Sequence, residues 1–178
     1  MRQRLEANGV QVLNTGSDKV DYLGSEGDGR FDSEAVADGR EKLLAHLGDK
    51  VPGNACIALI GYSEGVLAIK QALREVSSPV GTRIVSVELF ADPKVIAGRA
   101  GGDPGIDPAF ASRVFSICDD TDPLCTNRGW ISPDQKRDCA RSIGDCFVPG
   151  HLTTAYGEEA ARAAEWAAAK YEGTSEGS

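Results

Sequence analysis

Apolar residues are arranged along the chain in segments whose spacing alternates between that of helices and that of strands. In residues 33–48 they recur at helical spacing, which predicts a helix that starts at Ser33 and ends at Gly48. Residues 55–60 form a continuous apolar run of strand length, which predicts an interior parallel strand covered on both faces. A helical pattern then follows over residues 64–76.

The same alternation continues on both sides of this central part. Residues 83–90 and 113–117 predict two further strands, and the alanine-rich residues 158–171 predict a closing amphipathic helix. At the front, residues 1–8 suit a short helix and residues 10–13 a strand. This order predicts an α/β fold, a three-layer sandwich with a central, mainly parallel sheet and sites beyond the carboxyl ends of its strands.

Length and charge narrow the class of protein further. The 178 residues are enough for a single domain, which we place at residues 1–172, with a disordered tail over residues 173–178. A formal net charge of -8 disfavours binding to nucleic acid or to anionic membranes. No apolar stretch reaches the length of a membrane span, and the first residues lack the apolar core of a secretory signal. We expect a monomer.

Cysteine spacing bears on the compartment in which the protein works. Four of the five cysteines form two local pairs with the same seven-residue offset: Cys118 with Cys125, and Cys139 with Cys146. Disulfides at these pairs would fit a secreted protein, and closing an eight-residue loop stabilises a fold by about 2.5 kcal/mol in the chain-entropy model. The alternative is four reduced thiols in the cytosol. Zinc is disfavoured because no Cys-x-x-Cys spacing occurs, and we expect no metal and no cofactor.

A candidate nucleophile lies between the second predicted strand and the helix after it. Residues 61–65 read Gly-Tyr-Ser-Glu-Gly, a Gly-x-Ser-x-Gly pattern centred on Ser63. Such a pattern matters at a sharp strand-to-helix turn, where the glycines allow close packing and the serine is lifted above the sheet. The pentad alone is a weak signal for a nucleophile, and its position between a predicted strand and a predicted helix is the stronger evidence. The alternative is an ordinary turn in which Ser63 caps the helix.

A nucleophilic serine needs an imidazole to take its proton and a carboxylate to orient that imidazole. In α/β folds of this kind the chain order is serine, acid, histidine, which excludes His46 as the base and leaves His151. The acid should follow a strand between Ser63 and His151. Three aspartates follow residues 113–117, and the residues alone do not choose among them, since each could be a solvated turn residue: Asp119, Asp120 and Asp122.

These motifs resemble those of the cutinase family of serine esterases, including its actinobacterial members. The family carries Gly-Tyr-Ser-Gln-Gly at the nucleophile, a Cys-x-x-Gly-Asp-x-x-Cys loop and a His-Leu pair before the last helix; residues 61–65, 118–125 and 151–152 match these. The resemblance implies an ester hydrolase that acts through an acyl-enzyme on short- or medium-chain esters or polyesters. It selects Asp122 as the acid, and it assigns the backbone N–H of Glu64 to the oxyanion hole.

Several positions depart from the family pattern. Glu64 replaces glutamine and Thr121 replaces glycine, and the charge of Glu64 would disfavour an oxyanion unless its carboxylate points to solvent or is protonated. The family opens with a strand and a Gly-Ser or Gly-Thr loop, which supplies a second oxyanion donor and which we do not find before Met1. We expect that residues 10–17 take its place or that the N-terminal strand is lacking. Cys56, outside the family's usual cysteine positions, is expected to be a buried free thiol.

Two other functions remain open from the sequence. One is the esterase with which phages of mycolate-bearing bacteria detach the outer lipid layer by cleaving mycolyl-arabinogalactan, although the cysteines around Asp122 favour the cutinase branch. The other is a truncated, catalytically weak or idle module that keeps the serine turn without a complete oxyanion hole. Reaction of Ser63 with a fluorophosphonate would separate an assembled site from an idle one.

Overall fold

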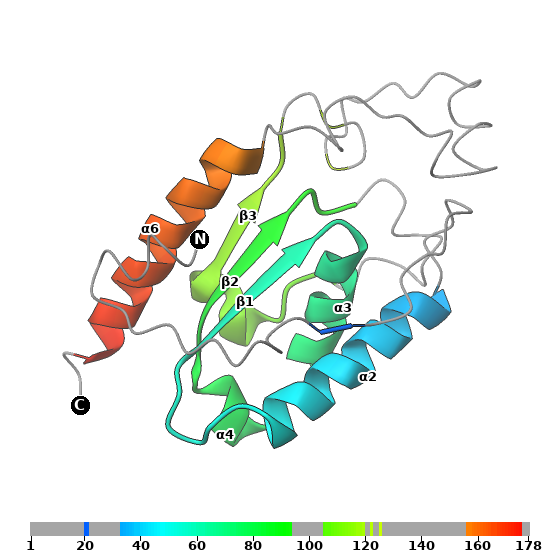
Figure 1. Ribbon diagram of the computed structural model, residues 1–178, viewed down its shortest axis with the longest axis vertical. Coiled ribbons are helices and arrows are strands. Elements are labelled where there is room, and N and C mark those ends of the chain that lie inside the picture. The colour runs from blue at the N-terminus through cyan, green and yellow to red at the C-terminus, as the bar shows by residue number, and fades with distance from the viewer. Residues whose placement is uncertain are drawn as a thin grey trace.

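The protein is built on a parallel sheet. The computed structural model describes residues 20–21, 33–93, 105–119, 122, 125 and 156–175. Within them the sheet has three strands in the order β1-β2-β3, all parallel, so that the strands end at one edge (Figure 1). The bounds of these strands are β1 Ile57–Tyr62, β2 Ile84–Phe90 and β3 Val114–Ile117.

Helices cover both faces of this sheet, which confirms the predicted three-layer α/β architecture. Helices α2 (Ser33–Asp49) and α3 (Glu64–Leu73) lie on one face, and α6 (Tyr156–Ser175) lies on the other (Figure 1). Two short helical segments, α4 (Ser78–Gly81) and η2 (Pro108–Arg113), precede β2 and β3. Crossover connections place helices on the faces because parallel strands cannot be joined by tight turns.

The core is divided between the two faces. On one side Val87 and Leu89 of β2 pack with apolar residues of α2, α3 and β1. On the other side Phe90 and Ile117 pack with Tyr156 and Ala163 of α6. The small alanines of α6 let this helix approach the sheet closely, and four of them are buried: Ala163, Ala164, Ala167 and Ala168.

Strand β1 differs from its prediction in position and in burial. It begins and ends two residues later than the apolar run at 55–60, and its residues alternate between buried and exposed rather than being buried on both faces. Ile60 is 52% exposed and Tyr62 is 43% exposed. The reason is that α6 packs mainly on β2 and β3, whereas α3 lies against β1 on its other face.

Other boundaries follow the predictions within a few residues. Helix α2 matches its prediction, with one further residue at its end. Helix α3 ends three residues early because the N–H groups of Glu75 and Val76 both donate to Ala72 O, which closes the helix in a turn. Helix α6 begins two residues early and continues to Ser175, so residues 173–175 of the expected disordered tail belong to this helix. The predictions for residues 1–8, 10–13 and 176–178 lie outside the described residues.

Two further expectations concern the surface. Cys56 is a free thiol, as expected, but it is exposed rather than buried, because it precedes β1 in the loop that leads into the strand. In the described part of the chain, no helix has the length and apolar character needed to cross a membrane.

Candidate functional site

The carboxyl ends of the three strands bring the candidate residues to one edge of the sheet. Ser63 directly follows β1, and Cys118 directly follows β3. Asp92 is the second residue after β2. Two backbone hydrogen bonds hold these exits side by side: Ser63 N donates to Phe90 O at 2.9 Å, and Ala91 N donates to Ile117 O at 2.9 Å. This is the edge at which α/β folds form their sites.

Ser63 has an unusual backbone conformation. Its φ is 52° and its ψ is -121°, a region that residues with a side chain rarely adopt. The side chain makes no capping hydrogen bond to α3, so the alternative in which Ser63 is an ordinary helix cap is wrong. This conformation stores local strain, as expected for a serine at a sharp strand-to-helix turn.

Gly61 explains how the strand and the helix meet so closely at this turn. A Cβ atom added to Gly61 would lie 2.7 Å from Ile69 Cδ1 and 3.2 Å from both Cα and N of Val66. Side-chain movement cannot relieve a contact with backbone atoms, so the close crossing of β1 and α3 requires glycine at this position. The first glycine of the pentad therefore has a packing role.

Glu64 is the first residue of α3 and is only 7% exposed. The Glu64 carboxylate therefore does not point to solvent. Its charge would disfavour an oxyanion unless the carboxylate is protonated. Its backbone N–H belongs to the first turn of the helix, where amides have no partner within the helix and favour negative charge. This amide remains the candidate oxyanion donor that the sequence indicated.

Asp92 is engaged by a buried lysine. Lys70 Nζ of α3 lies 2.5 Å from Asp92 Oδ2, and the two side chains are 2% and 4% exposed. The positive φ of Ala91, 54°, turns the chain after β2 and brings Asp92 beneath α3. Because a buried charge needs its counter-charge, this pair is a structural tie between α3 and the end of β2 rather than a reactive acid.

Asp122 lies in a loop closed by a disulfide. Cys118 and Cys125 are bonded, with their Cα atoms 5.8 Å apart, which confirms this predicted pair. Within the loop, Asp122 N donates to Asp119 O at 2.9 Å and forms a turn. Asp122 is fully buried, whereas Asp119 is partly exposed. Burial thus distinguishes the two aspartates that residue type alone left equal.

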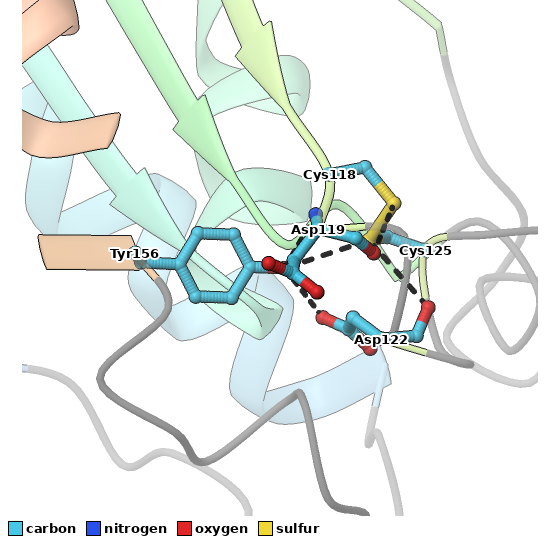
Figure 2. Close-up of a disulfide and its surroundings, with 5 residues drawn as sticks. All are labelled: Cys118, Asp119, Asp122, Cys125 and Tyr156. Atoms are coloured by element: carbon cyan, nitrogen blue, oxygen red, sulfur yellow. Dashed lines mark hydrogen bonds between the residues drawn. A yellow bond between two sulfur atoms is a disulfide. The ribbon is translucent and has the colours of Figure 1, made fainter. Parts of the chain in front are cut away.

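Tyr156, the first residue of α6, contacts this loop directly. Its hydroxyl donates to Asp122 Oδ2 at 2.7 Å and accepts from Asp119 N at 3.3 Å (Figure 2). Its ring meets the edge of Tyr62 at 5.7 Å and of Phe90 at 6.2 Å between centroids. Burial, and then the hydrogen bond to Asp122, raise the pKa of Tyr156.

The charge of Asp122 also reaches the serine turn. Burial, followed by the negative charge of Asp122, raises the pKa of Tyr62, the residue before Ser63. The loop after β3 and the turn after β1 therefore share one electrostatic environment, although β2 lies between them. Three of the predicted residues, Ser63, Glu64 and Asp122, are brought to the same edge.

The remaining predicted residues lie outside the described part of the chain: Asp120, His151 and the pair Cys139 and Cys146. Two contributors were not found from the sequence, Tyr156 and Lys70. An aromatic residue between His151 and the predicted start of the last helix was the one signal for Tyr156. In the described residues, no three His, Cys, Asp or Glu side chains gather as a metal site.

A serine at a strained turn between a parallel strand and a helix, with a buried acid after a later strand, defines the α/β-hydrolase class of fold. Solved structures agree on the fold. An acetyl xylan esterase structure superposes with a TM-score of 0.59 at 20% identity, covering 85% of this chain and 80% of that one. A second acetyl xylan esterase structure superposes with a TM-score of 0.54 at 20% identity, covering 78% and 72%.

A family profile described as Cutinase matches residues 7–171, and the chain belongs to the cutinase family. Carboxylesterase Culp1 of Mycobacterium tuberculosis is 28% identical over 103 residues, which are 54% of this chain and 48% of that protein. The cutinase of Blumeria hordei is 34% identical over 80 residues, 45% of this chain and 31% of that protein. The matched segment thus spans about half or less of the length of these relatives.

Proposed function

We propose that the protein is a serine carboxylic-ester hydrolase that acts through an acyl-enzyme on short- or medium-chain esters or polyesters. The observation that carries the proposal is the backbone of Ser63, held at φ 52° between a parallel strand and a helix without serving as a cap. Strain of this kind persists where the surrounding structure maintains it, and it is concentrated at reactive residues. Membership of the cutinase family supports the same reaction class.

In the proposed mechanism Ser63 Oγ attacks the ester carbonyl carbon while His151 takes the hydroxyl proton. Asp122 orients the imidazole and stabilises its positive charge, and the N–H of Glu64 donates to the oxyanion. The carbon–oxygen bond to the alcohol then breaks, and His151 returns the proton to that oxygen. A water molecule, deprotonated by His151, then attacks the acyl carbon. The bond to Ser63 Oγ breaks, His151 returns the proton to that oxygen, and the carboxylic acid is released.

The choice of Asp122 over Asp119 rests on its environment. It is fully buried and hydrogen-bonded, whereas Asp119 is partly exposed, and a carboxylate that must hold an imidazole in one orientation needs a rigid, dry setting. The disulfide between Cys118 and Cys125 restricts the loop further and supports the cutinase branch over the phage esterase. It also supports export of the protein, since disulfides persist in oxidising compartments.

The names of the relatives support the substrate class. A carboxylesterase and a cutinase share sequence with this chain, two acetyl xylan esterase structures share its fold, and all three names denote enzymes that cleave esters. All residues given a role lie in one chain, and we expect a monomer, to be checked by light scattering. Cleavage of cutin and short esters, compared with mycolyl-arabinogalactan, separates this function from that of the phage esterase.

Replacement of the nucleophile tests the proposal. Ser63→Ala removes the attacking oxygen, and we expect the rate of p-nitrophenyl butyrate hydrolysis to fall by at least about a thousandfold, as for other serine nucleophiles. Ser116→Ala, which makes the same change at an exposed position of β3, is the matched control and should keep the wild-type rate. A Ser63→Ala protein with undiminished activity contradicts the mechanism.

Labelling with a fluorophosphonate tests the idle-module alternative in the same proteins. An activated serine displaces the fluoride and gains a covalent phosphonyl group, which mass spectrometry locates on the peptide that contains Ser63. We expect labelling of the wild-type protein and of Ser116→Ala, and none of Ser63→Ala. A wild-type protein that does not react would identify an unassembled site.

A further inference from the structure

Asp122 is held by a residue that lies 34 positions away, at the start of helix α6. The hydroxyl of Tyr156 donates to Asp122 Oδ2 at 2.7 Å, and both side chains are buried. The same hydroxyl accepts from Asp119 N at 3.3 Å, while Asp122 N donates to Asp119 O at 2.9 Å. Tyr156, Asp119 and Asp122 thus close a small network across the base of the disulfide loop (Figure 2).

We infer that Tyr156 is a positioning residue, which holds one oxygen of the Asp122 carboxylate so that the carboxylate meets the imidazole at a set angle. The inference rests on the proposed function, in which Asp122 orients the base. A carboxylate without such a hold can rotate about its Cβ–Cγ bond, which has broad torsional preferences. A donor at one oxygen selects one rotation, and so selects the direction in which the other oxygen points.

Tyr156 is itself fixed in place, which a positioning residue requires. Tyr156 is 8% exposed, and its ring makes edge-to-face contacts with the rings of Tyr62 and Phe90. Edge-to-face contacts of this kind restrict the ring plane as well as its position. Tyr62 precedes Ser63 and Phe90 ends β2, so the ring is anchored on the serine turn and on the neighbouring strand. The position of Asp122 is therefore tied to the turn that carries the proposed nucleophile.

The hydroxyl also affects the charge of Asp122. A donated hydrogen bond stabilises the ionised carboxylate, because it withdraws part of the negative charge. Without this bond the carboxylate becomes a stronger base, both toward a proton and toward an imidazolium. The neutral imidazole that takes the serine proton would then be present only at higher pH, and the acid limb of the pH profile of kcat/KM would move upward.

Tyr156→Phe tests the inference, because it keeps the ring and removes only the hydroxyl. We expect kcat on p-nitrophenyl butyrate to fall by about tenfold with little change in KM, as for the loss of a hydrogen bond to a charged group. We expect the acid limb of kcat/KM to rise by about half a pH unit. Tyr171→Phe, 15 residues and about 22 Å further along α6, is the matched control and should change neither quantity.

A double-mutant cycle separates positioning from a structural role. If Tyr156 acts through Asp122, then Tyr156→Phe lowers kcat in the wild-type background but not further in an Asp122→Asn background. Independent effects that multiply would overturn the inference. All variants are compared well below their thermal midpoints, so that a loss of folding is not read as a loss of turnover. The pKa of His151, one of two histidines in the chain, is followed by NMR in the same variants and should rise in Tyr156→Phe.

The outcomes for the two proposals are distinct. The positioning role would be refuted if Tyr156→Phe kept the wild-type kcat and the wild-type acid limb. If Ser63→Ala lost activity in the same experiments, the hydrolase mechanism would still stand. Undiminished activity in Ser63→Ala would refute both.

Discussion

Ser63 carries a backbone conformation that a smaller residue would adopt more easily. Its φ of 52° and ψ of -121° cost about 1 to 3 kcal/mol in a residue with a Cβ atom, but little in glycine. We therefore expect Ser63→Gly to be more stable than Ser63→Ala by about 1 kcal/mol, although both variants lack the hydroxyl and should be inactive. Urea unfolding of the two variants measures the difference.

Ser116 is the control at the same scale. It lies in β3, where glycine is disfavoured, so that Ser116→Gly should be less stable than Ser116→Ala by about 0.5 to 1 kcal/mol. The difference in stability between the glycine and alanine variants should thus have opposite signs at Ser63 and Ser116. The same sign at both would mean that the turn at Ser63 stores no strain, and the strongest support for its role as the nucleophile would be lost.

Strand β2 contains a buried carboxyl that the proposed reaction does not use. Glu88 is fully buried between Ile60 of β1 and Phe115 of β3, and neither carboxyl oxygen has a hydrogen-bond partner among the described residues. Burial raises the pKa of Glu88 to about 7. Ser86, on the same strand, offsets this only in part, since its hydroxyl does not reach full hydrogen-bond geometry with the carboxyl.

This raised pKa makes the stability of the fold depend on pH. Between pH 4.5 and about 7 folded Glu88 keeps a proton that the unfolded chain releases, so stability is lost as the pH rises through this window. Glu88→Gln removes the charge, and we expect it to be more stable than the wild type by about 3 kcal/mol at pH 8 but by under about 1 kcal/mol at pH 5. Urea midpoints at the two pH values measure this. Glu41→Gln, at a surface position, should differ little from the wild type at either pH, and a pH-independent gain in Glu88→Gln would contradict the expectation.

The disulfide between Cys118 and Cys125 acts on the whole chain, because it restricts the unfolded ensemble as well as the folded loop. The double variant Cys118→Ala/Cys125→Ala lacks the cross-link that closes this eight-residue loop, and its free energy of unfolding should be lower by about 2.5 kcal/mol. It should also lower kcat, since Asp122 depends on the loop for its position. Urea unfolding and p-nitrophenyl butyrate kinetics measure the two effects. Cys56→Ala, at the exposed free thiol, is the control, and wild-type kcat in the double variant would show that the loop holds Asp122 without the cross-link.

Local patterns in the sequence were sufficient to predict most of the described helices and strands. The helical spacing of residues 33–48 and the apolar residues of 83–90 predicted α2 and β2, because each pattern reflects backbone geometry and burial within one short segment. The pentad around Ser63 and the cysteine spacing of 118–125 are local in the same sense. The amino-acid sequence alone was therefore enough to locate Ser63 and the disulfide loop, whereas the role of His151 remains a prediction.

Contacts between distant segments could not be obtained in this way. Tyr156 meets Asp122 across 34 positions and Lys70 meets Asp92 across 22, and no short pattern in the sequence predicts either contact. The open face of β1 was missed for a related reason: an apolar run indicates that a strand is buried, but not which of its faces a helix covers. These features arise only when whole elements pack together, since the free energy that selects them is shared among many side chains from segments far apart in the chain.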